Sequence, residues 1–443
     1  MSSKRHPDVQ GVGRKAKRQR QRRHLYFVVD DGDGYAIRKI DLSPDYDSDD
    51  DAARHEDGEI ETVGAAWSPL PEALIRLPAQ TGEFFVASGT KILITNCGWP
   101  EHAVPVFDVH SRSLALGPRP HSRTCPHTPI YMPVARNVVS VDAGSSTKLL
   151  YPPPPERSSF AWSWLCFEFR PKKRISAEFR PSRPGAKSIF QPKLVKFEKS
   201  QTENQNAGSW DKLADKPPFR RVDVTCHAAH PDGRTLFVST VSKGAPATFT
   251  LDTGAEDGVG VWKQHGSWKL PFKGQALFDP ALDAWVGLSG DKDTLGHLCS
   301  SDVPPVDADD AGSETAPMWR LSKEKLFCRD PGEEHLGAEL VYMGGRSKFC
   351  ILQCFSIVYD EKDDDDDEGD SYQEDDIDDE SDPYKEEVNE ENLPRRHLLQ
   401  LITFTLKYDK NGELTTAKRR RVRCFELLRH ADPLFDDVRA FWI

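Results

Sequence analysis

The clearest pattern along the chain is a series of short apolar runs that stop at residues typical of turns. Residues 25–29 and 35–40 flank an Asp-Gly-Asp-Gly turn, and residues 84–87 and 92–95 flank a Ser-Gly-Thr turn. Runs of this kind, rich in β-branched and aromatic residues, predict strands, and the glycine-containing turns between them predict antiparallel hairpins.

Two further pairs of runs follow the same rule. Residues 222–230 and 235–239 flank Pro-Asp-Gly-Arg, which is the strongest hairpin signal in the sequence. Residues 349–359 and 398–408 are two long apolar runs with an acidic stretch between them. We expect these runs to pair and to extrude the stretch as a loop, because the entropic cost of closing a loop grows slowly with its length.

A weak internal repeat points to the same architecture. An apolar strand leads into an Asp-containing turn and a second strand follows, in copies that begin at Val106, Phe249, Phe278 and Phe404. Repeats of several strands at a spacing of about 50 residues are typical of kelch-type blades. We therefore predict an all-β fold, a β-propeller of kelch-like type with five or six blades. The alternative is a pair of β-sandwich or barrel domains.

The predicted propeller-like domain covers residues 24–443 and follows a disordered basic N-terminal tail, 1–23. Three stretches interrupt it: an acidic loop at 43–62, a partly disordered polar insertion at 151–217 and a disordered acidic loop at 360–394. The two acidic loops have too few apolar residues to contribute to a core, and the insertion has four prolines near its start, which is typical of irregular structure.

Composition places the chain among intracellular globular proteins. Its 443 residues are 37% hydrophobic, which suffices for a large core. Its nine cysteines are odd in number and scattered, so we expect reduced thiols. We find no signal peptide and no apolar run long enough to span a membrane. The expected location is the cytoplasm, the nucleus or both, without membrane contact.

The net charge of −12 is unevenly distributed. Residues 360–391 contain 20 acidic and 2 basic side chains, whereas the first 23 residues contain nine Lys or Arg and one Asp. Removing both stretches leaves a net charge of −2, so the body of the protein is nearly neutral.

Both charged stretches are candidate partner-binding segments. The first resembles a nuclear-import signal or a segment for an anionic partner and comprises Arg14, Lys15, Lys17, Arg18, Arg20, Arg22 and Arg23. The second would bind basic partners and comprises Asp363, Asp364, Asp365, Asp366, Asp367 and Glu368. The plainer interpretation is a solvated tail and a solvated loop. No aromatic residue interrupts the basic run, so we do not expect direct nucleic-acid binding.

Several stretches carry a family resemblance, namely His-Pro-Asp-Gly-Arg-Thr-Leu-Phe-Val-Ser at 230–239 and the segments 248–253, 265–276, 282–288, 335–341 and 403–414. Together they resemble the plant, grass-expanded domain-of-unknown-function family sixteen-sixty-eight. That family is similar to kelch and galactose-oxidase-type propellers. The resemblance implies the fold and brings no catalytic residues with it.

Two groups of residues have ligand chemistry suited to zinc: Cys226, His227 and His230, and His121, Cys125 and His127. Neither has a second pair at finger spacing, and alternation along a strand turns His227 and His230 to opposite faces. We therefore expect no metal site, no cofactor and no catalytic residue.

Other chemistry-bearing residues have structural interpretations. Cys350 and Cys354 would lie on one strand face, too far apart for a disulfide, and we expect both in the core. Trp262, Trp268 and Trp285 would pack between blades, or line a ligand groove. The basic run at 418–423 alternates with Val422 and is expected to form a solvated strand face.

These observations favour a non-enzymatic protein-interaction or scaffold module that is a monomer with unknown protein partners. One alternative is a nuclear factor that binds basic partners through its acidic loop. Another is an enzyme with a site in the propeller channel.

Overall fold

The fold is given by a computed structural model, which describes residues 23–30, 34–42, 67–78, 84–95, 103–118, 130–135, 137–141, 146–150, 209–214, 216–254, 260–306, 315–358, 395–417, 420–427 and 439–443. Within these ranges the chain is all-β and has no α-helix. The helical segments described there are two 3-10 turns, η2 (Arg221–Asp223) and η3 (Lys292–Thr294). No helix in the described ranges has the length and apolar character needed to cross a membrane.

The strands form five sheets, which we number by chain order. Sheet I has the order β26 (Arg439–Trp442), β1 (Leu25–Asp30), β2 (Gly34–Ile40) and β4 (Ala73–Pro78). Sheet II consists of β5 (Phe84–Ser88), β6 (Lys91–Thr95), β7 (Ala103–Asp108) and β8 (Ser113–Pro118). Sheet III consists of β9 (Ile130–Val134), β10 (Asn137–Val141), β11 (Ser146–Leu150) and β12 (Ser209–Ala214).

Sheet IV is a curled eight-stranded sheet with two halves. The first half is β13 (Val224–Ala229), β14 (Thr235–Ser242), β15 (Ala245–Asp252) and β16 (Lys263–Gly266). The second half is β17 (Phe272–Asp279), β18 (Ala284–Ser289), β19 (Leu298–Asp302) and β20 (Trp319–Leu321). Strands β13 and β17 pair in parallel and join the halves.

Sheet V contains the longest strands. Its order is β21 (Glu334–Gly344), β22 (Lys348–Val358), β23 (Arg395–Tyr408), β25 (Arg421–Glu426) and β3 (Ser68–Pro69), and β24 (Leu414–Thr416) also pairs with β23. The β25–β3 pair is parallel, whereas the pairs along the rest of the sheet are antiparallel.

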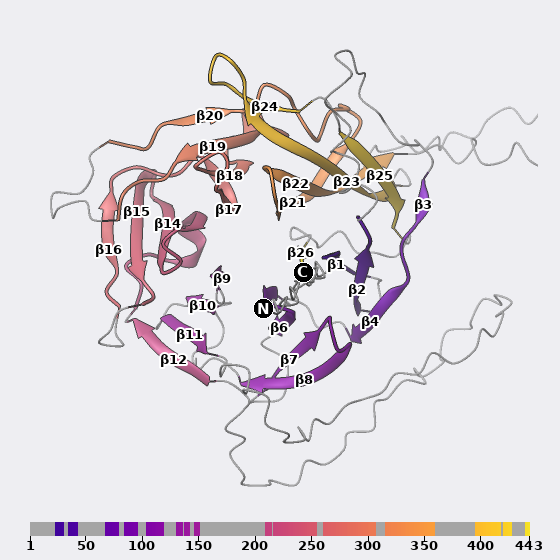
Figure 1. Cartoon of the computed structure of the whole chain (residues 1–443), viewed down its shortest axis with the longest axis horizontal. Coiled ribbons are helices and arrows are strands. Elements are labelled where there is room, and N and C mark those ends of the chain that lie inside the picture. Colours follow the sequence, from indigo (N-terminus) through magenta and orange to yellow (C-terminus); the bar gives the residue numbers. More distant parts are fainter. Residues whose placement is uncertain are drawn as a thin grey trace, which may run out of the picture.

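The sheets are arranged around a common centre, with the C-terminal strand β26 on the inside (Figure 1). A hydrophobic cluster fills each interface between neighbouring sheets and between the halves of sheet IV, and the clusters complete a circle. Side chains alternate along each strand, so Phe27 packs toward sheet V while Tyr26 and Val28 pack toward sheet II.

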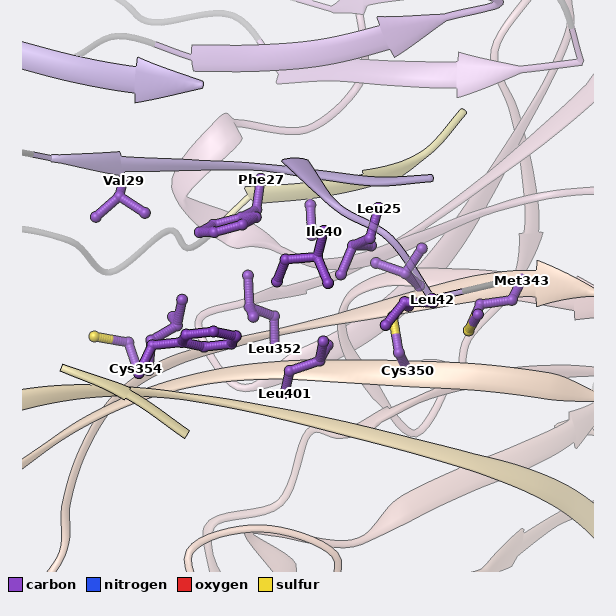
Figure 2. Close-up of a cluster of buried hydrophobic side chains, with 14 of the residues drawn as sticks. Leu25, Phe27, Val29, Ile40, Leu42, Met343, Cys350, Leu352, Cys354 and Leu401 are labelled. Carbon is purple, nitrogen blue, oxygen red and sulfur yellow. The ribbon is translucent and has the colours of Figure 1, made fainter. Parts of the chain in front are cut away.

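The interface of sheets I and V closes this circle. Figure 2 shows Leu25, Phe27 and Ile40 of sheet I facing Leu352 and Leu401 of sheet V. Pairing of β26 with β1 brings the two ends of the described chain together, and His24 and Ile443 exchange backbone hydrogen bonds of 2.7 and 3.1 Å. The first sheet is therefore built from both ends of the sequence.

The predicted hairpins are present. Strands β1 and β2, β5 and β6, and β13 and β14 pair where the sequence placed them. Residues 222 and 223 differ from the prediction: they were expected in the strand, but they belong to η2. The two long runs pair as β22 and β23 over eleven registered positions, from Lys348↔Thr405 to Val358↔Arg395.

The repeated Asp residues all accept hydrogen bonds from their own turns. A backbone N–H two residues on donates to Asp108, Asp252, Asp279 and Asp409 at 2.8–2.9 Å. The copies are not equivalent, however. Asp108 and Asp252 end β7 and β15, which are the third strands of their sheet and half-sheet. Asp279 instead ends β17, the first strand of its half-sheet. The repeat therefore marks a turn type that recurs at different positions in the sheets.

Several predicted segments fall outside the described residues: the tail up to residue 22, the loop at 43–62, the loop at 360–394 and most of the insertion at 151–217. The insertion ends earlier than predicted. Residues 209–214 form β12, whose pairing with β11 completes sheet III.

Candidate functional site

An open groove of about 900 Å³ lies at one end of the first half of sheet IV. One wall is the segment 216–223, which leads into β13. The other walls come from the β14–β15 hairpin and from β16. A volume of this size is at the upper end of those found for ligand sites in proteins.

Aromatic packing fixes the first wall. The chain bends at Pro218 and Phe219, and the ring of Phe219 packs on sheet IV. Its centroid lies 5.3 Å from that of Phe249 and 5.0 Å from that of Trp262, the latter edge to face. The groove therefore has a rigid apolar side.

An ion pair closes the base of this wall. Arg220 Nε and Nη2 donate to the two carboxylate oxygens of Asp223 at 2.9 and 2.8 Å, across the turn of η2. The hydrogen bond from Arg220 holds the pKa of Asp223 below its ordinary value, and Ser242 contributes a further hydrogen bond. Asp223 is buried, and the ion pair with Arg220 neutralises its charge.

The opposite wall ends in a tight turn. Lys243 and Gly244 connect Ser242 to Ala245, and both have positive φ, 49° and 84°. Two consecutive residues in this conformation match the twist of the flanking strands, as in type I′ hairpins. The turn projects the Lys243 side chain into solvent at the mouth of the groove.

Among the described residues, the exposed charges on the segments that form the groove are basic. Asp223 is the one carboxylate among the described residues that line it. Lys216 and Arg220 line the groove, and Arg221 and Lys243 are exposed on the same wall and on the turn. The site thus combines an apolar floor with a basic rim.

A second feature is the base of the β22–β23 hairpin, where the acidic stretch leaves and re-enters the sheet. Val358 and Arg395 are directly paired there. Glu334 on β21 bridges the two strands, since it accepts a hydrogen bond of 3.0 Å from Ser356 and pairs with Arg395. Both ends of the stretch are therefore held side by side.

Ionisable residues also meet on the inner strands of the ring. Arg439 on β26 donates to Glu339 on β21 at 3.3 Å. Burial, reinforced by the charge of Arg439, lowers the pKa of His227 on β13 to about 4. Burial together with Lys273 on β17 likewise lowers the pKa of His335 on β21. No sequence signal groups these residues, because they come from four strands separated along the chain.

The structure places one residue of the predicted charged segments. Arg23 is exposed at the start of the first sheet. The rest of the basic segment, Arg14 to Arg22, and the acidic residues Asp363 to Glu368 lie outside the described residues.

The first predicted ligand cluster does not converge. Cys226 is in the core, where burial raises its pKa to about 11, and His227 lies on the other face of β13. His230 accepts a hydrogen bond of 3.2 Å from the N–H of Asp232. His121, Cys125 and His127 are outside the described residues, and within those residues no three His, Cys, Asp or Glu are placed to hold a metal.

Two structural interpretations can be scored. Cys350 and Cys354 are buried as predicted, and so are Trp268 and Trp285. In the basic run at 418–423, Lys418 and Arg419 lie outside the described residues, and Arg420 is not on the solvated face that the alternation predicted. Arg420 is buried and donates to Thr416 Oγ1 at 3.0 and 2.7 Å, because Thr416 and Glu324 offer it partners beneath the sheet edge.

A family model described as "Protein of unknown function (DUF1668)" matches residues 22–425. The chain belongs to this family. The DUF1668 match begins before β1 and ends within β25, so the groove and the β22–β23 hairpin both lie inside it, whereas β26 lies beyond it. No curated protein matches the chain.

Solved structures give distant similarities to this DUF1668 member. The structure titled "Complex of KlAtg21 with coiled-coil of AgAtg16" shares 8% identity and a TM-score of 0.29, covering 89% of this chain and 97% of that chain. Hsv2 of Kluyveromyces lactis shares 10% identity and a TM-score of 0.32, covering 88% and 97%. At these scores the likeness assigns neither fold nor function.

Proposed function

We propose that this DUF1668 protein is a non-enzymatic interaction module that presents its acidic segment, residues 360–391, to basic protein partners in the cytoplasm or nucleus. The scaffold would be a monomeric propeller of six kelch-type blades, formed by sheets I, II, III and V and the two halves of sheet IV.

The arrangement of the strands supports the propeller. Each of the six units contains a meander of four strands in chain order, apart from the first, which borrows β26 from the C-terminus, and sheet V also carries β3 and β24. A unit that combines strands from both ends closes a ring and leaves few exposed sheet edges. The circle of hydrophobic clusters is what such a closed ring requires.

One observation carries the functional proposal: the acidic segment is inserted at the end of an unbroken hairpin. Pairing continues to Val358↔Arg395, so the insert leaves the sheet register intact. Both faces of the hairpin strands pack into hydrophobic clusters. The packed hairpin therefore fixes the two residues between which the segment is inserted. The segment can therefore engage a partner without rearrangement of the fold.

The chemistry of the segment defines its partner. A local net charge of −18 attracts Lys- and Arg-rich surfaces over about 10 Å at 0.1 M salt. Such binding should form rapidly and weaken as ionic strength rises. The tyrosines at 372 and 384 within the segment can add contacts with Arg side chains.

The test is binding of purified core histones, with hen lysozyme as a basic control of ordinary globular shape. Three forms are compared by titration: the full chain, a deletion of 360–391, and a variant with Asp363, Asp364, Asp365, Asp366 and Asp367 changed to Asn. We expect the full chain to bind histones more tightly than lysozyme, the Asn variant to bind less tightly, and the deletion to lose binding.

Histone affinity that does not fall as ionic strength rises would contradict the proposal, since the charge of the segment would then not explain the binding. Unchanged histone binding by the deletion would contradict it as well. Circular dichroism of each variant shows whether the β-sheet fold is retained.

A further inference from the structure

The groove beside residues 216–223 has a chemistry opposite to that of the acidic segment. Its rim carries the exposed side chains of Lys216, Arg221 and Lys243, and its single lining carboxylate among the described residues, Asp223, is already paired. The rim therefore repels basic ligands and attracts acidic ones.

The interior of the groove is suited to an apolar anchor. Phe219 and Phe249 expose ring surface to it, and Pro246 and Ala247 line it as well. Val222 and Val261, on the two segments that flank the groove, are 82% and 67% exposed. Apolar side chains this exposed are common at protein-binding surfaces, where a partner covers them.

The groove also adjoins an open sheet edge. Within the described residues, β16 pairs with β15 and with no strand on its other side. An extended peptide can use the free N–H and C=O groups of such an edge, with its side chains directed to alternate faces. Gln264 belongs both to this edge strand and to the groove lining.

We propose that this groove binds an extended acidic peptide of a partner protein, with an aromatic residue seated against Phe219 and Phe249 and its carboxylates directed to the lysines of the rim. This proposal uses a different surface from the acidic segment and does not depend on the function proposed for it.

The acidic segment of the chain itself must be considered as a competitor. Strand β13 pairs in parallel with β17, and the charge of Lys273 near the start of β17 acts on His335 near the start of β21. These strands therefore start at the same end of the ring. Asp223 of the groove precedes β13, and Val358 is at the end of β22 that lies beside the start of β21. The groove and the insert consequently share one side of the ring.

The experiment uses a short synthetic peptide of Asp and Glu with one central tyrosine, titrated by fluorescence anisotropy. Binding is measured on the full chain, on the 360–391 deletion and on the triple variant Lys216→Glu, Arg221→Glu, Lys243→Glu. A remote reversal, Lys407→Glu on β23, is the matched control, because Lys407 is equally exposed on another sheet.

We expect the triple variant to bind the peptide at least about tenfold more weakly, since each reversal replaces an attraction with a repulsion. The Lys407→Glu control should match the full chain. Replacing the peptide tyrosine by serine should also weaken binding, because the aromatic floor loses its partner. Ala245→Trp, at the exposed edge of the groove, should block binding by filling it.

Two results would overturn the proposal. One is equal binding by the triple variant and by the Lys407→Glu control. The other is an affinity that rises tenfold or more when 360–391 is deleted, since the groove would then be occupied by the chain's own segment. Histone binding is measured on the same samples, so failure here is distinguishable from failure of the acidic-segment function.

Discussion

The β22–β23 and β14–β15 hairpins end on the same side of the ring, yet they are built differently. The first packs against hydrophobic clusters on both sides and opens at its end into the 36 residues 359–394. The second closes with the two-residue turn Lys243–Gly244, and the start of β15 is exposed. The β14–β15 hairpin also packs into hydrophobic clusters on both faces. The comparison therefore teaches that a hairpin buried on both faces can end either in a two-residue turn or in a long insertion.

The largest expected effect comes from weakening the hairpin that carries the insert. Leu352 on β22 is fully buried between sheets I and V. Leu352→Ala should lower the free energy of unfolding by about 2–5 kcal/mol, because it removes apolar contacts and leaves a cavity. Urea denaturation measures this. Val358→Ala on the same strand is the control, since Val358 is 47% exposed and should cost about 0.5 kcal/mol or less.

The next effect is a dependence of stability on pH that arises beside the β14–β15 hairpin. His227 lies on β13, next to β14, and burial lowers its pKa to about 4 from 6.5. The unfolded chain therefore takes up this proton at a higher pH than the folded chain does. The folded state keeps its full stability above pH 6.5 and loses up to about 3 kcal/mol as the pH falls toward 4.

Urea midpoints measured across that range test this prediction. In His227→Gln the loss between pH 6.5 and 4 should be smaller, whereas the exposed His110→Gln should leave it unchanged. An identical pH profile for His227→Gln and the unaltered chain would show that another group is responsible. Within the β22–β23 hairpin, Cys354 has its pKa raised by burial, to about 12, so it stays neutral throughout this range.

Removing the insert should stabilise the protein. Deletion of 360–391 shortens the connection from 36 residues to four, which is about three halvings of loop length and about 2 kcal/mol of closure entropy. Thermal unfolding should show a higher midpoint. A lower midpoint would indicate that the acidic segment makes stabilising contacts with the ring.

The smallest effect concerns the short turn. Gly244 has φ +84°, and a Cβ there would meet no atom within 4 Å, so the cost of Gly244→Ala is purely conformational. It should be about 1 kcal/mol. Lys243→Asn should stabilise by a few tenths of a kcal/mol, because Asn adopts positive φ more readily than Lys. Equal stability of all three forms would show that the turn does not limit this hairpin.

Sequence patterns located most hairpins but not the sites. The apolar runs at 349–359 and 398–408 identified β22 and β23, which pair over eleven positions. The groove was missed because its walls come from residues 216–223, 240–249 and 264–267, none of which carries a recognisable motif. A Pro-Pro-Phe-Arg segment before a predicted strand was the one available signal.

The short-range features of this protein were determined by its sequence: strands by apolar alternation, turns by Gly and Asp, and an acidic insert within a hairpin. Each depends on residues close together along the chain, whose geometry local sterics and hydrogen bonding fix. Tertiary structure alone decided that β26 joins β1, that Arg420 is buried and that basic side chains surround a groove. These features depend on packing between segments far apart in sequence, which no local pattern specifies.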